Sequence, residues 1–205
     1  MRTLALDCAT EACTVALFEG DELLDHRHET IGRGHAERLV PMISELDGRG
    51  RAQSILVGLG PGSFTGARIA LSTARSLAIA WSSEVEGFST VALLAATARR
   101  QLGAIAMTVV TNAGHGEVLV QSFEADGSPI DEVRSMPIDA VDRSHVQAVL
   151  VGNRSQILSD QANERSATAH AILPDARDAL GIEHSGLTRR LAPIYARPPD
   201  ATPRK

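Results

Sequence analysis

The stretch Gly60-Pro61-Gly62-Ser63-Phe64-Thr65-Gly66-Ala67-Arg68-Ile69 decides how this chain folds, because it joins an apolar run, Ile55–Leu59, to a long helical pattern. Glycines and a proline between a buried strand and a helix predict a tight loop with backbone N–H groups free to meet an anion or another backbone. The spacing excludes two common nucleotide motifs. A Walker loop needs Gly-x4-Gly-Lys-Ser/Thr, and Gly-x-Gly-x-x-Gly needs one residue fewer than lies between Gly62 and Gly66.

The loop also contains two hydroxyl side chains of the kind that serve as nucleophiles in enzymes, Ser63 and Thr65. The neighbouring glycines stand at the wrong distance for a Gly-x-Ser-x-Gly elbow. We therefore predict that Ser63 or Thr65 caps the following helix. Phe64 is expected to anchor the loop or to contact a partner, because a phenylalanine is unusual in so tight a turn.

Strands and helices alternate on both sides of this loop. Before it, the pattern predicts three antiparallel strands and then a helix from Ala36 that Pro41 should kink; the strands are at 3–7, 14–18 and 22–28. After it, we expect a helix, a strand and a helix at 67–81, 85–88 and 90–100. Beyond Gly103 a second set of strands follows at 104–111, 117–123 and 146–151. This order predicts an α/β protein of two stacked lobes, 1–103 and a smaller 104–205.

The predicted helix at 67–81 is apolar on more than one side, whereas an amphipathic surface helix shows one stripe. Ala70, Ala74 and Ala78 form a column of small residues at a spacing of four, which allows a neighbouring helix to approach closely. The sequence therefore predicts that this helix is either sandwiched in the core or buried in a subunit interface.

Composition narrows the classes of function. The 205 residues allow one large or two small domains, and the net charge of -5 argues against a dedicated nucleic-acid-binding protein. Lys205 is the only lysine. No internal lysine can form a Schiff base or contact a phosphate, which excludes several classes of enzyme.

The cysteines and histidines suggest no metal site. Cys8 and Cys13 are interpreted as small buried hydrophobic residues, and without a signal sequence they indicate a reduced, cytoplasmic chain. No pair of histidines has the spacing of a helical His-x-x-x-His site, and His26 and His28 alone would not complete a metal site. No apolar run approaches the ~18 residues of a membrane span.

Asp7 ends the first predicted strand and allows two interpretations. In two-lobed nucleotide-binding folds, an acid at this point can lie near a metal-bound phosphate, with Thr10 and the loop residues Gly60, Gly62 and Ser63 facing the nucleotide. Alternatively, Asp7 holds its own turn through backbone hydrogen bonds. The sequence leaves both open.

Several motifs together resemble the TsaB family, the dimerisation subunit of the bacterial machinery that makes threonylcarbamoyladenosine in tRNA. The ten-residue loop stretch at 60–69 resembles the most specific signature of that family. The other matching segments are Leu4–Thr10, His35–Pro41, Gly87–Thr90, Asn112–Val118 and Pro193–Arg197. The likeness is strong over residues 1–100 and rests on two short segments beyond them.

The resemblance implies a two-lobed fold of the actin, sugar-kinase and Hsp70 type with ribonuclease-H-like lobes. It also implies a non-catalytic role beside a catalytic paralogue, TsaD, which carries a His-x-x-x-His metal motif that this chain lacks. TsaE would join the complex, TsaC would supply threonylcarbamoyl-adenylate, and tRNA would be contacted indirectly. No cofactor is expected on this chain alone, while ATP or ADP at the interface of the complex stays open.

On this hypothesis, the helices after His35 and after Gly66 pack against the matching helices of TsaD, or against a second copy when TsaD is absent. The predicted interface residues are His35, Leu39, Val40, Ile43, Phe64, Ala67, Ile69, Ala70, Ala74, Leu77, Ala78 and Trp81. Two alternatives stay open: a peptidase that acts alone, and a nucleotide-binding regulator that uses Asp7, Thr10 and the glycine loop.

Overall fold

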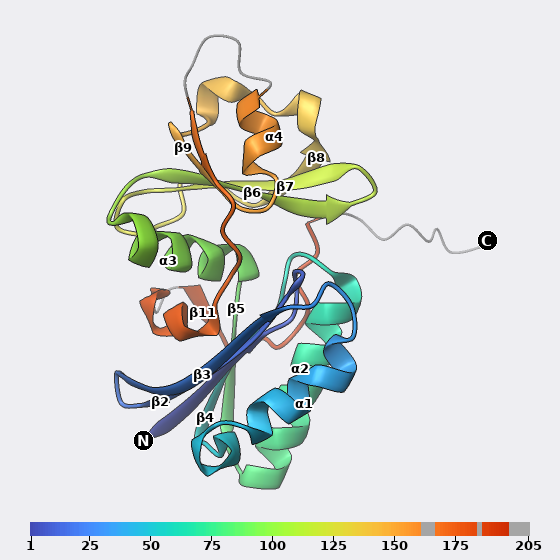
Figure 1. Ribbon diagram of the computed structural model, residues 1–205, viewed down its shortest axis with the longest axis vertical. Coiled ribbons are helices and arrows are strands. Elements are labelled where there is room, and N and C mark those ends of the chain that lie inside the picture. The colour runs from blue at the N-terminus through green and yellow to red at the C-terminus, as the bar shows by residue number, and fades with distance from the viewer. Residues whose placement is uncertain (161–166, 184–185, 197–205) are drawn as a thin grey trace, which may run out of the picture.

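A computed structural model describes residues 1–160, 167–183 and 186–196, which form two β-sheets with helices between and outside them (Figure 1). The strands of the first sheet are β1 Arg2–Asp7, β2 Ala12–Glu19, β3 Glu22–Thr30, β4 Ser54–Gly58, β5 Glu84–Phe88 and β11 Leu187–Thr188. Those of the second are β6 Met107–Gly114, β7 Glu117–Phe123, β8 Arg134–Pro137, β9 Val149–Val151 and β10 Thr168–His170. The α-helices are α1 His35–Ser44, α2 Phe64–Trp81, α3 Thr90–Leu102 and α4 Ser155–Asp160.

The two sheets repeat one topology. In the first sheet, β1, β2 and β3 form an antiparallel meander, and β4 and β5 continue in parallel from β1. In the second, β6, β7 and β8 form the meander, and β9 and β10 continue in parallel from β6. The ribonuclease-H-like arrangement is thus present twice, and the predicted two-lobed α/β fold is confirmed.

Helices and sheets alternate as layers, and a separate apolar cluster fills each space between them. Helices α1 and α2 cover the outer face of the first sheet, α3 lies between the sheets, and α4 covers the outer face of the second (Figure 1). Helix α3 serves both lobes: Leu93 and Ala96 pack toward the first sheet, and Val91 and Leu94 pack toward the second. The two lobes therefore share one buried helix.

The chain returns to the first lobe after it has completed the second. The short helix η4, Ala176–Gly181, packs with Ile182 on the inner face of the first sheet, and β11 pairs with β5 at the sheet edge. Ala176 and Ala179 of η4 share one apolar cluster with Phe18 of the sheet and with Leu93 of α3. The division at residue 103 stays a prediction, and both η4 and β11 pack on the first lobe.

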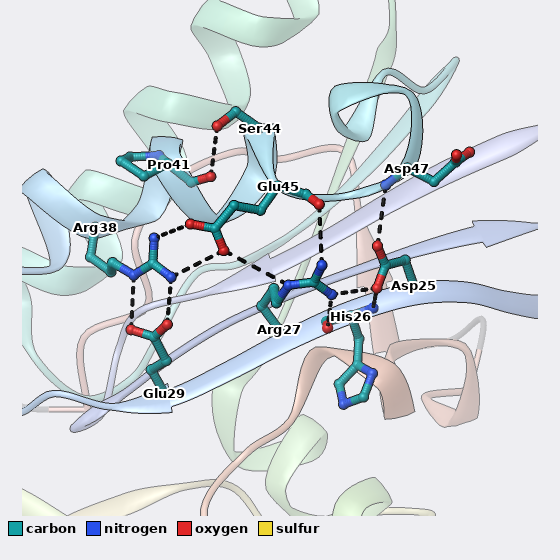
Figure 2. Close-up of polar contacts among 9 residues, drawn as sticks. All are labelled: Asp25, His26, Arg27, Glu29, Arg38, Pro41, Ser44, Glu45 and Asp47. Atoms are coloured by element: carbon teal, nitrogen blue, oxygen red, sulfur yellow. Dashed lines mark hydrogen bonds and ion pairs between the residues drawn. The ribbon is translucent and has the colours of Figure 1, made fainter.

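Charged side chains hold α1 against the edge strand β3 (Figure 2). Arg38 donates to both carboxylate oxygens of Glu29, at 2.8 and 2.5 Å, and also to Glu45, at 2.6 Å. Arg27 pairs with Asp25 and Glu45 from the strand side. These hydrogen bonds from Arg38 lower the pKa values of the Glu29 and Glu45 carboxyls.

The remaining short helices are η1 Asp47–Gly50, η2 Ile138–Ala140 and η3 Arg143–His145.

Several predicted boundaries shift. Helix α2 begins at Phe64 and not at Ala67, because Ser63 caps it earlier. The strand predicted at 104–111 lies at 107–114, and the strand predicted at 146–151 begins only at Val149. Helix α1 continues through Pro41 and ends at Ser44. Among the described residues, no helix is long and apolar enough to cross a membrane.

Candidate functional site

The glycine loop packs against the turn between β1 and β2. A Cβ atom on Gly62 would lie 2.1 Å from the backbone oxygen of Ala9, and one on Gly66 would lie 1.9 Å from that of Cys8. Real Cβ atoms do not approach an oxygen so closely, so both positions require glycine. The Ser63 N–H donates to the Ala9 oxygen at 2.7 Å. The loop thus meets another backbone, which is one of the two roles that its glycines predict.

Helix α2 begins with the cap that the sequence predicts. The Ser63 hydroxyl accepts a hydrogen bond from the Gly66 N–H at 3.1 Å, which satisfies one of the free donors of the first turn. The carbonyl of Gly60 accepts from the Thr90 N–H at 2.8 Å, which ties the loop to the start of α3. Capping by Ser63 is confirmed, and the Phe64 side chain is half exposed beside it.

Asp7 is fully buried, and both of its carboxylate oxygens have partners within the chain. One accepts from the Ala9 N–H at 2.9 Å and the other from the Thr90 hydroxyl at 2.5 Å. Burial raises the pKa of this carboxyl from 3.8 to about 6, although both hydrogen bonds act in the opposite direction. Asp7 therefore holds its own turn and the start of α3. This matches the second interpretation that the sequence left open.

We expect this buried carboxyl to make stability depend on pH. Between pH 4 and pH 7 the folded state retains a proton that the unfolded chain releases, so ionisation of Asp7 lowers the free energy of unfolding as pH rises. A pKa moved from 3.8 to about 6 corresponds to about 3 kcal/mol. The stability of the wild type relative to Asp7→Asn should fall by most of that amount, about 2 kcal/mol, over this range, measured by urea unfolding. A difference that does not change with pH would contradict the assignment.

A second contact joins the two lobes at the turn between β1 and β2. The Glu11 carboxylate accepts two hydrogen bonds from the Asn153 amide, at 2.9 and 2.7 Å, and Asn153 in turn accepts from Thr111 and from the Asn112 N–H. Glu11 follows β1 in the first lobe, while Asn153 follows β9 in the second. A negative carboxylate thus lies between the lobes, where it would repel a phosphate.

The five residues expected to face a nucleotide are close together, but each has a role within the chain. Asp7 binds Thr90 and Ala9, the Thr10 hydroxyl accepts from the Ala12 N–H at 3.1 Å, and Ser63 caps α2. Gly60 and Gly62 adopt positive φ angles that favour glycine. Their arrangement explains the loop signature by close backbone packing. Sequence reasoning missed Glu11, because nothing near it indicates a partner in the other lobe.

The cysteines behave as predicted. Cys8 and Cys13 are both free and buried, with their sulfurs 3.7 Å apart across the β1–β2 turn. The hydrogen bond to Cys13 and burial raise the pKa of the Cys8 thiol. In the ranges that the structure describes, no group of three His, Cys, Asp or Glu side chains could hold a metal ion.

The predicted interface residues divide by burial, and part of that prediction is wrong. Six of them are buried in the chain's own fold and are not available to a partner: His35, Leu39, Ile43, Ala67, Ala70 and Ala74. Ile69, Leu77, Ala78 and Trp81 are partly buried against the same cluster. Only Val40 and Phe64 are exposed, each by 52%. The alanine column faces the first sheet because α2 packs directly on it.

An uncharged face of α1 and α2 remains open to solvent. It consists of Ala36, Val40, Thr65, Ile69, Ser72, Ser76, Ile79 and Ala80, which we call the docking face. Ile79 is 84% exposed, the highest exposure of any large hydrophobic residue on these two helices. The members on α2 recur every three or four positions, so they form one stripe along the helix. Small and uncharged side chains in such a stripe allow another helix to approach closely.

A cavity of about 520 Å³ lies between the lobes, next to α3. Apolar side chains from both lobes line it, among them Ala92, Phe123 and Ile182, and Tyr195 is also a lining residue. Arg99 also lines the cavity, and its Nε atom is buried without a hydrogen-bond partner. Cavities of this size at domain boundaries are where small molecules or inserted side chains bind.

Comparisons with known proteins agree on a family. The family model described as "TsaD: tRNA N6-adenosine threonylcarbamoyltransferase" matches residues 28–174. The chain is 32% identical over 198 residues to the tRNA threonylcarbamoyladenosine biosynthesis protein TsaB of Escherichia coli (strain K12), covering 89% of this chain and 85% of that protein. It is also 26% identical to the TsaB of Bacillus subtilis (strain 168), over 65% of this chain and 59% of that protein.

Solved structures agree with the sequence relatives. A crystal structure described as YeaZ from Pseudomonas aeruginosa is 30% identical and superposes with a TM-score of 0.81, covering 95% of this chain and 99% of that one. Another from the same organism, described as an uncharacterized protein with similarity to peptidase YeaZ, has a TM-score of 0.82 and covers 96% and 99%. Identity over nearly the whole chain and the shared fold show that this chain belongs to the TsaB family.

Proposed function

We propose that this chain is a non-catalytic scaffold subunit of the complex that forms threonylcarbamoyladenosine in tRNA. It binds TsaD and orients it, so that TsaD transfers the threonylcarbamoyl group to the adenosine next to the anticodon. The names of its relatives support the process, since each is described as a tRNA threonylcarbamoyladenosine biosynthesis protein. The absence of any histidine pair spaced by four in the sequence supports the non-catalytic role.

The docking face is the observation that carries this proposal. It combines exposed Val40 and Ile79 with small side chains, and none of its members is charged. The TsaD family model covers residues 28–174, which include all of α1 and α2. A partner with the same pair of helices could therefore pack against this face about a pseudo-two-fold axis. When TsaD is absent, two copies of this chain would pair through the same face, because such a patch is self-complementary.

The other members of the machinery follow from the same proposal. TsaE would join the assembled pair, TsaC would supply threonylcarbamoyl-adenylate, and ATP or ADP would bind only where the subunits meet. The Glu11 carboxylate between the lobes supports the view that this chain alone binds no nucleotide, because it lies where a phosphate would be repelled.

An omission assay tests the proposed role. TsaD, TsaE, TsaC, threonine, bicarbonate, ATP and tRNA are mixed with and without this chain, and the modified nucleoside is counted by mass spectrometry. We expect product only when both this chain and TsaD are present. Equal product without this chain would overturn the scaffold role. Peptidase activity of the isolated chain on a casein substrate would instead favour a separate enzyme.

A charge on the docking face should separate pairing from folding. We expect Ile79→Glu to weaken binding to TsaD about 30-fold or more, because the interface would bury an unpaired carboxylate. Its melting temperature should stay near that of the wild type, since Ile79 is 84% exposed. The matched control is Ile130→Glu, which makes the same change at an exposed residue of the second lobe. Equal affinity of the two variants in gel filtration and calorimetry would exclude this face.

A further inference from the structure

An aromatic and cationic cluster lies where the glycine loop meets residues 194–196. The rings of Phe64 and Tyr195 stack with centroids 5.4 Å apart, and both side chains are half exposed. The guanidinium carbon of Arg68 lies 3.6 Å from the centre of the Phe64 ring, and Arg68 donates to the Tyr195 hydroxyl at 3.2 Å. Exposed stacked rings next to a guanidinium are a typical surface for nucleobases or for protein contacts.

The charges around this cluster favour an anionic partner. Helix α2 contains Arg68 and Arg75 and no acidic residue. Within the described part of the chain, neither arginine forms an ion pair, whereas Arg2, Arg38 and Arg177 each bind a carboxylate. Arg75 donates one hydrogen bond, to the Leu191 carbonyl at 2.6 Å. These two arginines thus place positive charge on a helix without carboxylates, in a chain of net charge -5.

The backbone beneath the cluster is firmly held. The Ile194 N–H donates to the Leu59 carbonyl at 2.8 Å, which places Tyr195 beside the glycine loop. The loop in turn rests on the β1–β2 turn through Gly62 and Gly66. A platform held in this way loses little conformational freedom when it binds.

We propose that Phe64, Arg68, Arg75 and Tyr195 form a surface that binds unpaired nucleotides of RNA directly. The two guanidinium groups would hold the phosphates, and a base would stack on the open face of the Tyr195 ring. Tyr195 also lines the cavity of about 520 Å³ between the lobes, which has room for a base turned out of its strand. This inference rests on the proposed function, in which the RNA is a tRNA with an unpaired loop.

The RNA surface and the docking face adjoin each other on α2. Phe64 begins the helix, about 22 Å from Ile79 at the rise of an α-helix, but Arg75 lies only four positions before Ile79. The guanidinium groups of Arg68 and Arg75 reach Tyr195 and Leu191. Pairing with TsaD is therefore measured for each variant of the RNA surface.

Binding of a labelled tRNA transcript tests this proposal. The probe carries adenosine beside its anticodon, and its affinity is measured at several salt concentrations, both for this chain paired with TsaD and for this chain alone. We expect Arg68→Gln and Arg75→Gln each to weaken binding several-fold and to reduce the salt dependence by about one counterion. Tyr195→Ala should weaken binding about tenfold with an unchanged salt dependence, and Tyr195→Phe should bind nearly as the wild type does.

The controls separate this surface from general charge and from protein pairing. Arg51→Gln removes an exposed arginine before β4, at the far end of that strand from the loop, and should leave binding unchanged. A transcript whose anticodon arm is fully paired should bind more weakly. Equal affinity of all variants for the transcript would overturn the proposal. It would also be overturned if the variants no longer paired with TsaD but, as isolated chains, still bound RNA as the wild type does. Failure of the wild type to pair with TsaD would instead count against the scaffold role.

Discussion

Ala74→Glu is expected to unfold this protein, although the sequence alone places Ala74 in a partner interface. Ala74 is fully buried, and its neighbours belong to the cluster between α2 and the first sheet. An unpaired carboxylate there costs several kcal/mol, which is comparable to the whole stability of a typical domain. We expect circular dichroism at 25 °C to show loss of helical signal, or a urea midpoint far below that of the wild type.

The matched variant for this experiment lies on the same helix. Ile79→Glu introduces the same side chain five positions further along, at a residue that is 84% exposed, and should remain folded. The pair therefore separates the two faces of α2 with one chemical change. If Ala74→Glu folds as stably as Ile79→Glu, then α2 does not pack on the sheet in the way described.

Gly66→Ala should destabilise the protein by several kcal/mol, which reverses the usual sign for a helix. Gly66 lies in the first turn of α2, and alanine is normally favoured over glycine inside a helix by about 1 kcal/mol. Here the added methyl group would lie 1.9 Å from the Cys8 carbonyl oxygen. Because that oxygen belongs to the backbone, relief requires the glycine loop and the β1–β2 turn to move apart. Urea unfolding measures the loss.

The control is a glycine with room for a methyl group. Gly181 has an ordinary backbone conformation, and an added Cβ would find only the Ala96 methyl carbon, at 3.7 Å. We expect Gly181→Ala to change the free energy of unfolding by less than about 1 kcal/mol. A Gly66→Ala protein as stable as Gly181→Ala would show that the loop does not rest on the β1–β2 turn.

Local patterns predicted the longer elements well. Alternating residues indicated the meander of β1, β2 and β3, and the Ser63 hydroxyl before an apolar helix indicated the cap of α2. The short strands escaped prediction, because β8, β10 and β11 have four, three and two residues and carry too little periodicity. Each adds to the edge of a sheet whose other strands are already paired: β8 to β7, β10 to β9 and β11 to β5.

The sequence by itself determined the two-lobed order of elements, the glycine loop and its cap, and the lack of a helical histidine pair, because each is recorded within a few neighbouring residues. Tertiary structure alone decided which side of α2 is buried, since apolar residues surround that helix and only packing on the sheet separates Ala74 from Ile79. It also decided the contacts of Glu11 with Asn153 and of Arg68 with Tyr195, whose partners lie 142 and 127 positions apart. Polar side chains that meet at such a separation leave no local pattern, because the fold brings them together and their neighbours in sequence do not.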